Sequence, residues 1–123
     1  MVGVLVCPGQ GAQKVGMGRD LAERFPAAKD TFALIDAALG VALSRLMWEG
    51  PEAELTLTHN AQPAILAHSA AVWAVIGERI RPQLRGAAGH SLGEYSAYVA
   101  AGALSAESAA RLVRRRGELM FQA

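Results

Sequence analysis

A serine between two glycines is the residue of this sequence best suited to nucleophilic chemistry. Residues 89–93 read GHSLG, with Ser91 at the centre. The pattern G-x-S-x-G, placed after a strand and before a helix, is typical of a nucleophile elbow, a sharp turn that exposes the serine hydroxyl. The N–H groups that open the following helix, beginning with that of Leu92, then face a developing oxyanion. The alternative is that Ser91 is only a polar residue in a tight turn.

The glycine-containing loop at residues 8–18, PGQGAQKVGMG, has the wrong spacing for a phosphate-binding loop. G-x-G-x-x-G needs a glycine where Lys14 stands, and a Walker A loop starting at Gly11 needs a lysine where Met17 stands. Because the carboxyl ends of parallel strands lie at one edge of a sheet, we expect this loop beside Ser91. Gln10 could then donate a side-chain or a backbone N–H to the oxyanion. It could also be a solvated loop residue.

An arginine falls on the apolar face of the last predicted helix. Arg116 lies four positions after Leu112 and four before Met120, and residues so spaced share a helix face. An inward guanidinium needs an anionic partner, because burying an unpaired charge is costly. A carboxylate of the protein and a carboxylate of a substrate both fit its bidentate fork. The remaining arginines of this helix are expected on faces open to solvent: Arg111, Arg114 and Arg115.

None of the three histidines is expected to act as the base for Ser91. His90 is its neighbour, and adjacent side chains at a strand-turn point apart. His68 falls inside a long predicted helix. His59 falls in a predicted loop at an unknown distance from Ser91.

These residues require an α/β framework to position them. The apolar run at residues 2–7 predicts a buried strand, and the small residues at 84–89 predict a second strand parallel to it. Asn60 is the expected cap of the longest helix. Two strands alone do not make a stable open parallel sheet, so we expect the first part of a larger α/β protein. Helices are predicted over residues 19–25, 26–39, 43–48, 60–81, 92–101 and 106–122.

Composition narrows the classes of function. The net charge of +1 gives no general attraction for nucleic acid or a membrane surface. Cys7 is the only cysteine, so no internal disulfide is possible, and a buried, inert thiol is expected. The longest apolar region, residues 61–76, is too short and too polar to span a bilayer. No metal and no cofactor are predicted, and a cytoplasmic location is expected.

Four segments together resemble the malonyl-CoA:acyl carrier protein transacylases and the related acyltransferase domains of fatty-acid and polyketide synthases. The resemblance runs through essentially the whole chain, with the segments in the family's order. The segments are PGQGAQ at 8–13, NAQPA at 60–64, GHSLGEYSA at 89–97 and RLVRRRGELM at 111–120.

The resemblance implies a role for each candidate residue. Ser91 would be the nucleophile, and Gln10 with the N–H of Leu92 would form the oxyanion hole. Arg116 would bind the free carboxylate of a malonyl group, and Gln62 would lie near the entrance of the active site. The implied reaction moves malonyl from coenzyme A to the phosphopantetheine thiol of acyl carrier protein through a malonyl-serine ester. Malonyl-CoA and acyl carrier protein are the implied partners.

Members of that family are more than twice as long as this chain. We therefore expect residues 1–123 to be the N-terminal part of the large acyltransferase subdomain. The expected fold is an incomplete α/β-hydrolase-like parallel sheet core with flanking helices, lacking the later strands, the ferredoxin-like subdomain and the catalytic histidine. The chain alone is expected to be inactive and loosely folded, with a missing C-terminal portion as a possible partner. Two other functions stay open: a serine esterase or thioesterase of the α/β-hydrolase type, and a non-catalytic fragment that complements a partner chain.

Overall fold

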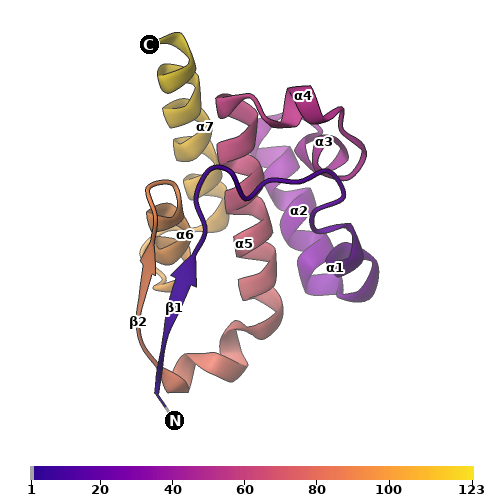
Figure 1. Cartoon of the computed structure of the whole chain (residues 1–123). Coiled ribbons are helices and arrows are strands. Elements are labelled where there is room, and N and C mark those ends of the chain that lie inside the picture. The colour runs from indigo at the N-terminus through magenta and orange to yellow at the C-terminus, as the bar shows by residue number, and fades with distance from the viewer. Residues whose placement is uncertain (1) are drawn as a thin grey trace.

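The computed structural model describes residues 2–123, which are arranged around one long helix, α5 (Thr58–Ile80). The strands β1 (Gly3–Cys7) and β2 (Leu84–Gly89) lie on one side of α5 (Figure 1). A short 3-10 turn, η1 (Arg81–Gln83), leads from α5 into β2. The predicted α/β class, with a small parallel sheet and many helices, is confirmed. The other helices are α1 (Arg19–Arg24), α2 (Pro26–Leu39), α3 (Leu43–Glu49), α4 (Glu52–Leu55), α6 (Gly93–Ala100) and α7 (Ala106–Gln122).

Several helices begin and end where cap and turn residues predict. Pro26 occupies the first turn of α2, where its missing N–H is not needed. Gly40 ends the same helix with a left-handed φ of 68°. Ser105 caps α7 by accepting a hydrogen bond from the Ser108 N–H at 3.1 Å. The predicted bounds of α7 agree with the structure, and the Ser105 cap is the local signal that defines its start.

The prediction that Asn60 caps α5 is wrong. The helix begins at Thr58, so Asn60 lies inside its first turn. The Asn60 Nδ2–H donates to the carbonyl of Glu54 at 2.8 Å. The side chain therefore ties the start of α5 to α4 instead of satisfying free N–H groups of its own helix.

The N-terminal half of α5 is the centre of the hydrophobic core. Every residue from 60 to 67 is buried, and α2 and α7 both pack against α5. Phe32 and Ile35 of α2 and Val113 of α7 belong to the same core. Of the helices between residues 2 and 123, none is both long and apolar enough to cross a membrane.

The two strands form a parallel pair, but their predicted burial is wrong. Val6 pairs with Ala88 and Cys7 with Gly89. Side chains alternate between the two faces of a strand, and β1 packs on α6 through only one of these faces. Cys7 is buried, whereas Val4 and Val6 are 60% and 75% exposed. Within residues 2–123 no element covers the face that carries these two valines.

The buried face of α7 is narrower than predicted. Ala109, Val113 and Gly117 are buried at four-residue spacing, so a stripe of small side chains lies against the core. Leu112 and Met120, expected on that stripe, are 47% and 48% exposed. The apolar period of the sequence located the helix correctly but overestimated the width of its buried face.

Candidate functional site

Ser91 follows β2 directly, in a backbone conformation that serine rarely adopts. Its φ is 53°, and it is the only non-glycine residue with positive φ between residues 2 and 123. Such a conformation costs about 1–3 kcal/mol and persists only where the surrounding structure enforces it. The strained turn between strand and helix is the geometry of a nucleophile elbow.

The two glycines of the elbow allow main-chain segments to touch. A Cβ on Gly89 would overlap the carbonyl group of Gly93 and the nitrogen of Glu94. A Cβ on Gly93 would overlap the carbonyl oxygen of Cys7, at the end of β1. The start of α6 therefore rests directly on the ends of both strands, and this contact leaves Ser91 exposed at the carboxyl edge of the sheet.

The main-chain N–H of Leu92 is available beside Ser91. The next N–H groups bond back to the turn, with Gly93 donating to the carbonyl of His90 at 2.9 Å and Glu94 to that of Ser91 at 3.0 Å. The Leu92 N–H donates to no acceptor in the described part of the chain. A free N–H at a helix start is a ready donor to an anionic atom.

The loop that carries Gln10 lies beside the elbow, as expected for the ends of parallel strands. A Cβ on Gly9 would overlap the carbonyl oxygen of His90. The side chain of Gln10 is already engaged, since its Nε2–H donates to Thr58 Oγ1 at 3.1 Å. Its main-chain N–H has no acceptor among residues 2–123. Of the two donors considered for Gln10, the main-chain N–H is therefore the free one.

Arg116 points from α7 toward Ser91. Its Nη2–H donates to Ser91 Oγ at 2.9 Å and its Nη1–H to Gln62 Oε1 at 2.7 Å. The guanidinium carbon lies 5.6 Å from the centre of the Tyr95 ring, within range of a cation–π interaction. No carboxylate of residues 2–123 forms an ion pair with Arg116. Its inward orientation is confirmed, and the alternative of a protein carboxylate finds no partner in the described chain.

Gln62 is fully buried beneath Arg116. Its Oε1 accepts from Arg116, and its Nε2–H donates to the sulfur of Met120 at 3.2 Å. A thioether is a weak acceptor, so the amide has one strong and one weak partner. Within these residues Gln62 supports the guanidinium from below.

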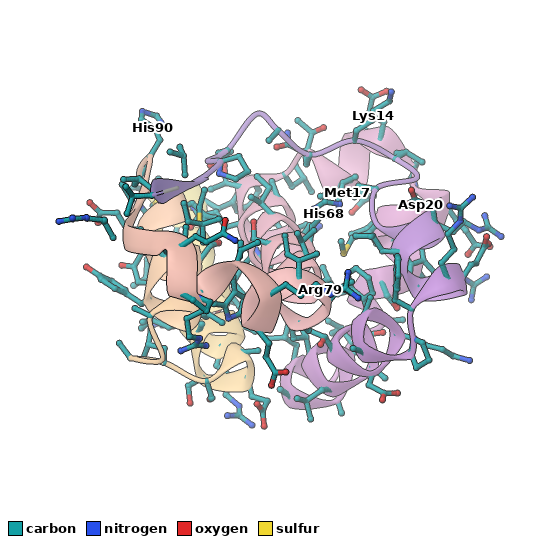
Figure 2. The ribbon with its side chains drawn as sticks, turned by 90° about the horizontal axis from the view of Figure 1, so that it is seen from below. Lys14, Met17, Asp20, His68, Arg79 and His90 are labelled. Atoms are coloured by element: carbon teal, nitrogen blue, oxygen red, sulfur yellow. The ribbon has the colours of Figure 1, made fainter. Side chains whose placement is uncertain are left out.

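None of the three histidines hydrogen-bonds to the Ser91 hydroxyl, whose partner within residues 2–123 is Arg116. His90 is exposed and projects from the edge of the molecule, well separated from His68 (Figure 2). Burial lowers the pKa of His68, an effect that the nearby Asp20 carboxylate partly opposes. The ring of His59 stacks edge-on against Phe121, with centroids 4.6 Å apart.

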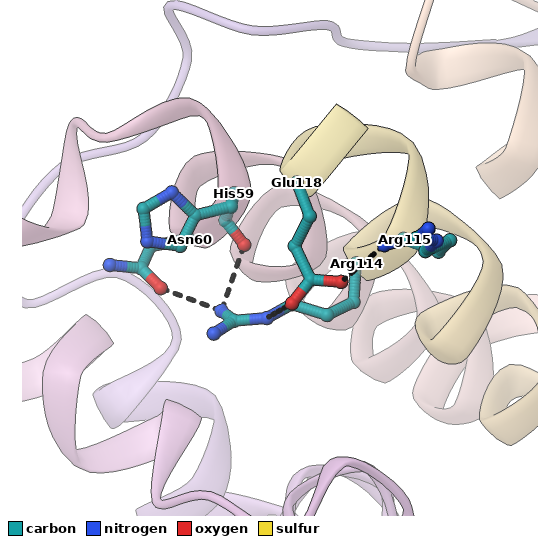
Figure 3. A network of polar contacts seen from close by, with 5 residues as sticks. All are labelled: His59, Asn60, Arg114, Arg115 and Glu118. Atoms are coloured by element: carbon teal, nitrogen blue, oxygen red, sulfur yellow. Dashed lines mark hydrogen bonds and ion pairs between the residues drawn. The ribbon is translucent and has the colours of Figure 1, made fainter. Parts of the chain in front are cut away.

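Sequence reasoning missed the contacts of Arg114, because this residue was expected on a solvent-facing side of α7. Its Nη1–H donates to the carbonyl of His59 at 2.9 Å and to Asn60 Oδ1 at 2.7 Å (Figure 3). Glu118 lies 3.7 Å from its Nε. Pro63, four residues after His59, is the available signal, because proline lacks the N–H that would occupy that carbonyl in a regular helix.

Known proteins match this chain over nearly all of its length. The acyl transferase domain family matches residues 4–123. A malonyl CoA-acyl carrier protein transacylase of Bacillus subtilis is 55% identical over 117 residues, covering 94% of this chain and 36% of that protein. The chain thus spans little more than a third of the curated relatives it matches.

Solved structures agree with this result. An acyl-carrier-protein-S-malonyltransferase from Bartonella henselae superposes with a TM-score of 0.94 at 47% identity, over 98% of this chain and 39% of that one. A malonyl-transacylase in complex with its type II PKS acyl-carrier protein gives a TM-score of 0.92 at 47% identity, over 99% of this chain and 40% of that one. With 120 of its residues matched (4–123) and the same arrangement of elements in solved relatives, this chain belongs to the acyl transferase domain family.

Proposed function

We propose that this chain carries the nucleophile and the carboxylate-binding arginine of an enzyme that transfers malonyl from coenzyme A to acyl carrier protein. The observation that carries the proposal is the 2.9 Å contact between Arg116 Nη2 and Ser91 Oγ. The names of relatives at 46–55% identity, all malonyl CoA-acyl carrier protein transacylases, point to the same substrates.

The chemistry of malonyl-CoA suits a cation beside the nucleophile. One methylene separates the free carboxylate of the malonyl group from the thioester carbonyl that Ser91 would attack. A guanidinium next to the serine can therefore bind the carboxylate while the carbonyl lies at the hydroxyl. On substrate binding, the Arg116 Nη2–H leaves Ser91 Oγ for the carboxylate, while Nη1 stays on Gln62.

The reaction then has two acyl transfers. A base other than His59, His68 and His90 takes the Ser91 proton as Oγ attacks the thioester carbonyl. The N–H groups of Leu92 and Gln10 stabilise the oxyanion of the tetrahedral intermediate. The C–S bond breaks, coenzyme A leaves as the protonated thiol, and malonyl remains as an ester on Ser91. The phosphopantetheine thiol of the carrier protein attacks that ester, and the serine recovers its proton.

We assign residues 1–123 to the N-terminal part of the large acyltransferase subdomain, with an α/β-hydrolase-like sheet that further strands complete. Two observations support this assignment. The chain spans 36–40% of its relatives, and one face of its sheet exposes Val4 and Val6.

The test uses a chimera in which this chain replaces the matching 117-residue region of the Bacillus subtilis relative. Brief incubation with malonyl-CoA, followed by proteolysis and mass spectrometry, should show one malonyl group on the peptide that contains Ser91. Arg116→Ala should remove most of the preference for malonyl-CoA over acetyl-CoA, and Arg111→Ala, an exposed position on the same helix, should keep it. An adduct on another residue, or no adduct, would overturn the proposal. An unchanged preference in Arg116→Ala would favour a general serine esterase.

A further inference from the structure

The candidate site has two halves, the loop that carries Gln10 and the side chain of Arg116. Residues in the first turns of α5 hydrogen-bond to both. Thr58 Oγ1 accepts from Gln10 Nε2 at 3.1 Å, and Gln62 Oε1 accepts from Arg116 Nη1 at 2.7 Å. Gln10 and Thr58 are 48 positions apart in the sequence, and Gln62 and Arg116 are 54 positions apart. The Gln10 loop and the side chain of Arg116 are thus both held by the start of α5.

Arg114 connects the start of α5 to α7 through hydrogen bonds. Its Nη1 bridges the carbonyl of His59 and the side chain of Asn60, at 2.9 and 2.7 Å. The His59 carbonyl is free for this contact because Pro63 has no N–H to offer it. Asn60 in turn donates to the carbonyl of Glu54 at 2.8 Å. The bridge therefore links α7 to α5 (Figure 3). Through Glu54 it also reaches α4, which precedes α5.

Gly117 brings the two helices into main-chain contact next to this bridge. A Cβ at Gly117 would lie 2.8 Å from His59 Cα and 2.9 Å from the carbonyl oxygen of Thr58. The two helices leave no room for a side chain at this point. Arg116, adjacent to Gly117, therefore takes its position from the fit between α7 and the start of α5.

We propose that residues 58–62 align the two halves of the site, with Thr58 positioning the Gln10 loop and Arg114 positioning Arg116. This inference rests on the proposed function, whose nucleophile and carboxylate site it connects. Thr58 holds the Gln10 side chain, which leaves the main-chain N–H of Gln10 as the donor to the oxyanion. Arg114 bonds to α5 and not to Ser91, so it acts through the placement of α7.

The two positioning residues have different kinetic signatures. Every acyl group that reaches Ser91 forms an oxyanion, so loss of the Thr58 hydroxyl slows acylation by malonyl-CoA and acetyl-CoA alike. Only malonyl-CoA has a carboxylate for Arg116, so loss of Arg114 slows malonyl transfer selectively. A displacement of about 1 Å at a reacting group costs up to about 100-fold in rate, and we expect about 10- to 100-fold in each case.

The experiment measures Ser91 acylation by each thioester in the chimera, with no carrier protein present. The variants are Thr58→Val, Thr58→Ser, Arg114→Gln and Arg111→Gln, each with a thermal melt by circular dichroism. Thr58→Val should slow both reactions equally, and Thr58→Ser, which keeps the hydroxyl, should restore them. Arg114→Gln should lower the ratio of malonyl to acetyl acylation, and Arg111→Gln should not.

Each other outcome is decisive. The inference is overturned if Thr58→Ser is as slow as Thr58→Val, or if Arg114→Gln slows both thioesters by the same factor. The inference is also overturned if the acylation rate of a variant falls only by the fraction of the protein that its melt shows to be unfolded. If the parent chimera is acylated at Ser91 and all variants match Arg111→Gln, the proposed function stands and this inference fails. If the parent is not acylated, the proposed function itself fails.

Discussion

The turn at Ser91 depends on the absence of a side chain at Gly89. A Cβ there would overlap three main-chain atoms, the carbonyl carbon and oxygen of Gly93 and the nitrogen of Glu94. Overpacking in a core, where side chains can move aside, costs about 1–3 kcal/mol. Main-chain atoms at a helix start cannot move aside independently, so we expect Gly89→Ala to cost about 3 kcal/mol or more.

Gly86 in the same strand is the matched control. A Cβ at Gly86 meets no atom within 4 Å, and a tolerated glycine-to-alanine change stabilises by about 0.4–1 kcal/mol through the unfolded state. Urea unfolding of the chimera, followed by circular dichroism, measures both variants. With an m-value of about 1–3 kcal/mol/M, Gly89→Ala should lower the midpoint by about 1 M or more. A free energy of unfolding within about 0.5 kcal/mol of that of Gly86→Ala would refute the steric account.

Three further predictions concern the rest of the described chain. Burial lowers the pKa of His68 below its usual 6.5, so the unfolded chain binds this proton more readily. The stability that neutral His68 contributes is present above about pH 6.5 and is lost as the pH falls below that value. Urea titrations at pH 7.5 and 5.5 measure this change in the free energy of unfolding, and it should be smaller in His68→Gln. Val6→Thr, on the uncovered face, should change the free energy of unfolding of this chain by less than about 0.5 kcal/mol. Val113→Thr should cost about 1–3 kcal/mol, because it buries a hydroxyl. Burial raises the pKa of the Cys7 thiol, so iodoacetamide at pH 8 should label it slowly until urea is added.

Each of these has a contrary result. An equal pH dependence in the parent and His68→Gln would mean that other groups control it. A loss for Val6→Thr as large as that for Val113→Thr would mean that the face of β1 that carries Val6 is packed. Equal labelling of Cys7 with and without urea would mean that the thiol is accessible in the folded chain.

Local signals predicted most of the elements correctly. Pro26 and Gly40 mark the ends of α2, and the glycines around Ser91 mark the elbow, because each acts on main-chain conformation within a few residues. The parallel direction of the strands followed from their order and apolar content. The inward orientation of Arg116 followed from the helical period, which relates residues three and four positions apart.

Other features were decided by partners far away in the sequence. Arg114 and Arg116 look alike in RLVRRRGELM, yet one bridges His59 and Asn60 while the other reaches Gln62 and Ser91. Their partners lie 25 to 55 positions away, and the helical period, which placed Arg116 inward, does not report which residues either guanidinium reaches.

The sequence by itself determined the position of the elbow motif, the order of the elements and the resemblance to acyltransferases, since these depend on residue type and short-range spacing. The tertiary structure alone decided that the side chain of Gln10 binds Thr58, that Gln62 is buried beneath Arg116 and that Val4 and Val6 are exposed. The physical reason is that burial and long-range hydrogen bonds depend on which surfaces meet, and folding brings those surfaces together from distant parts of the chain.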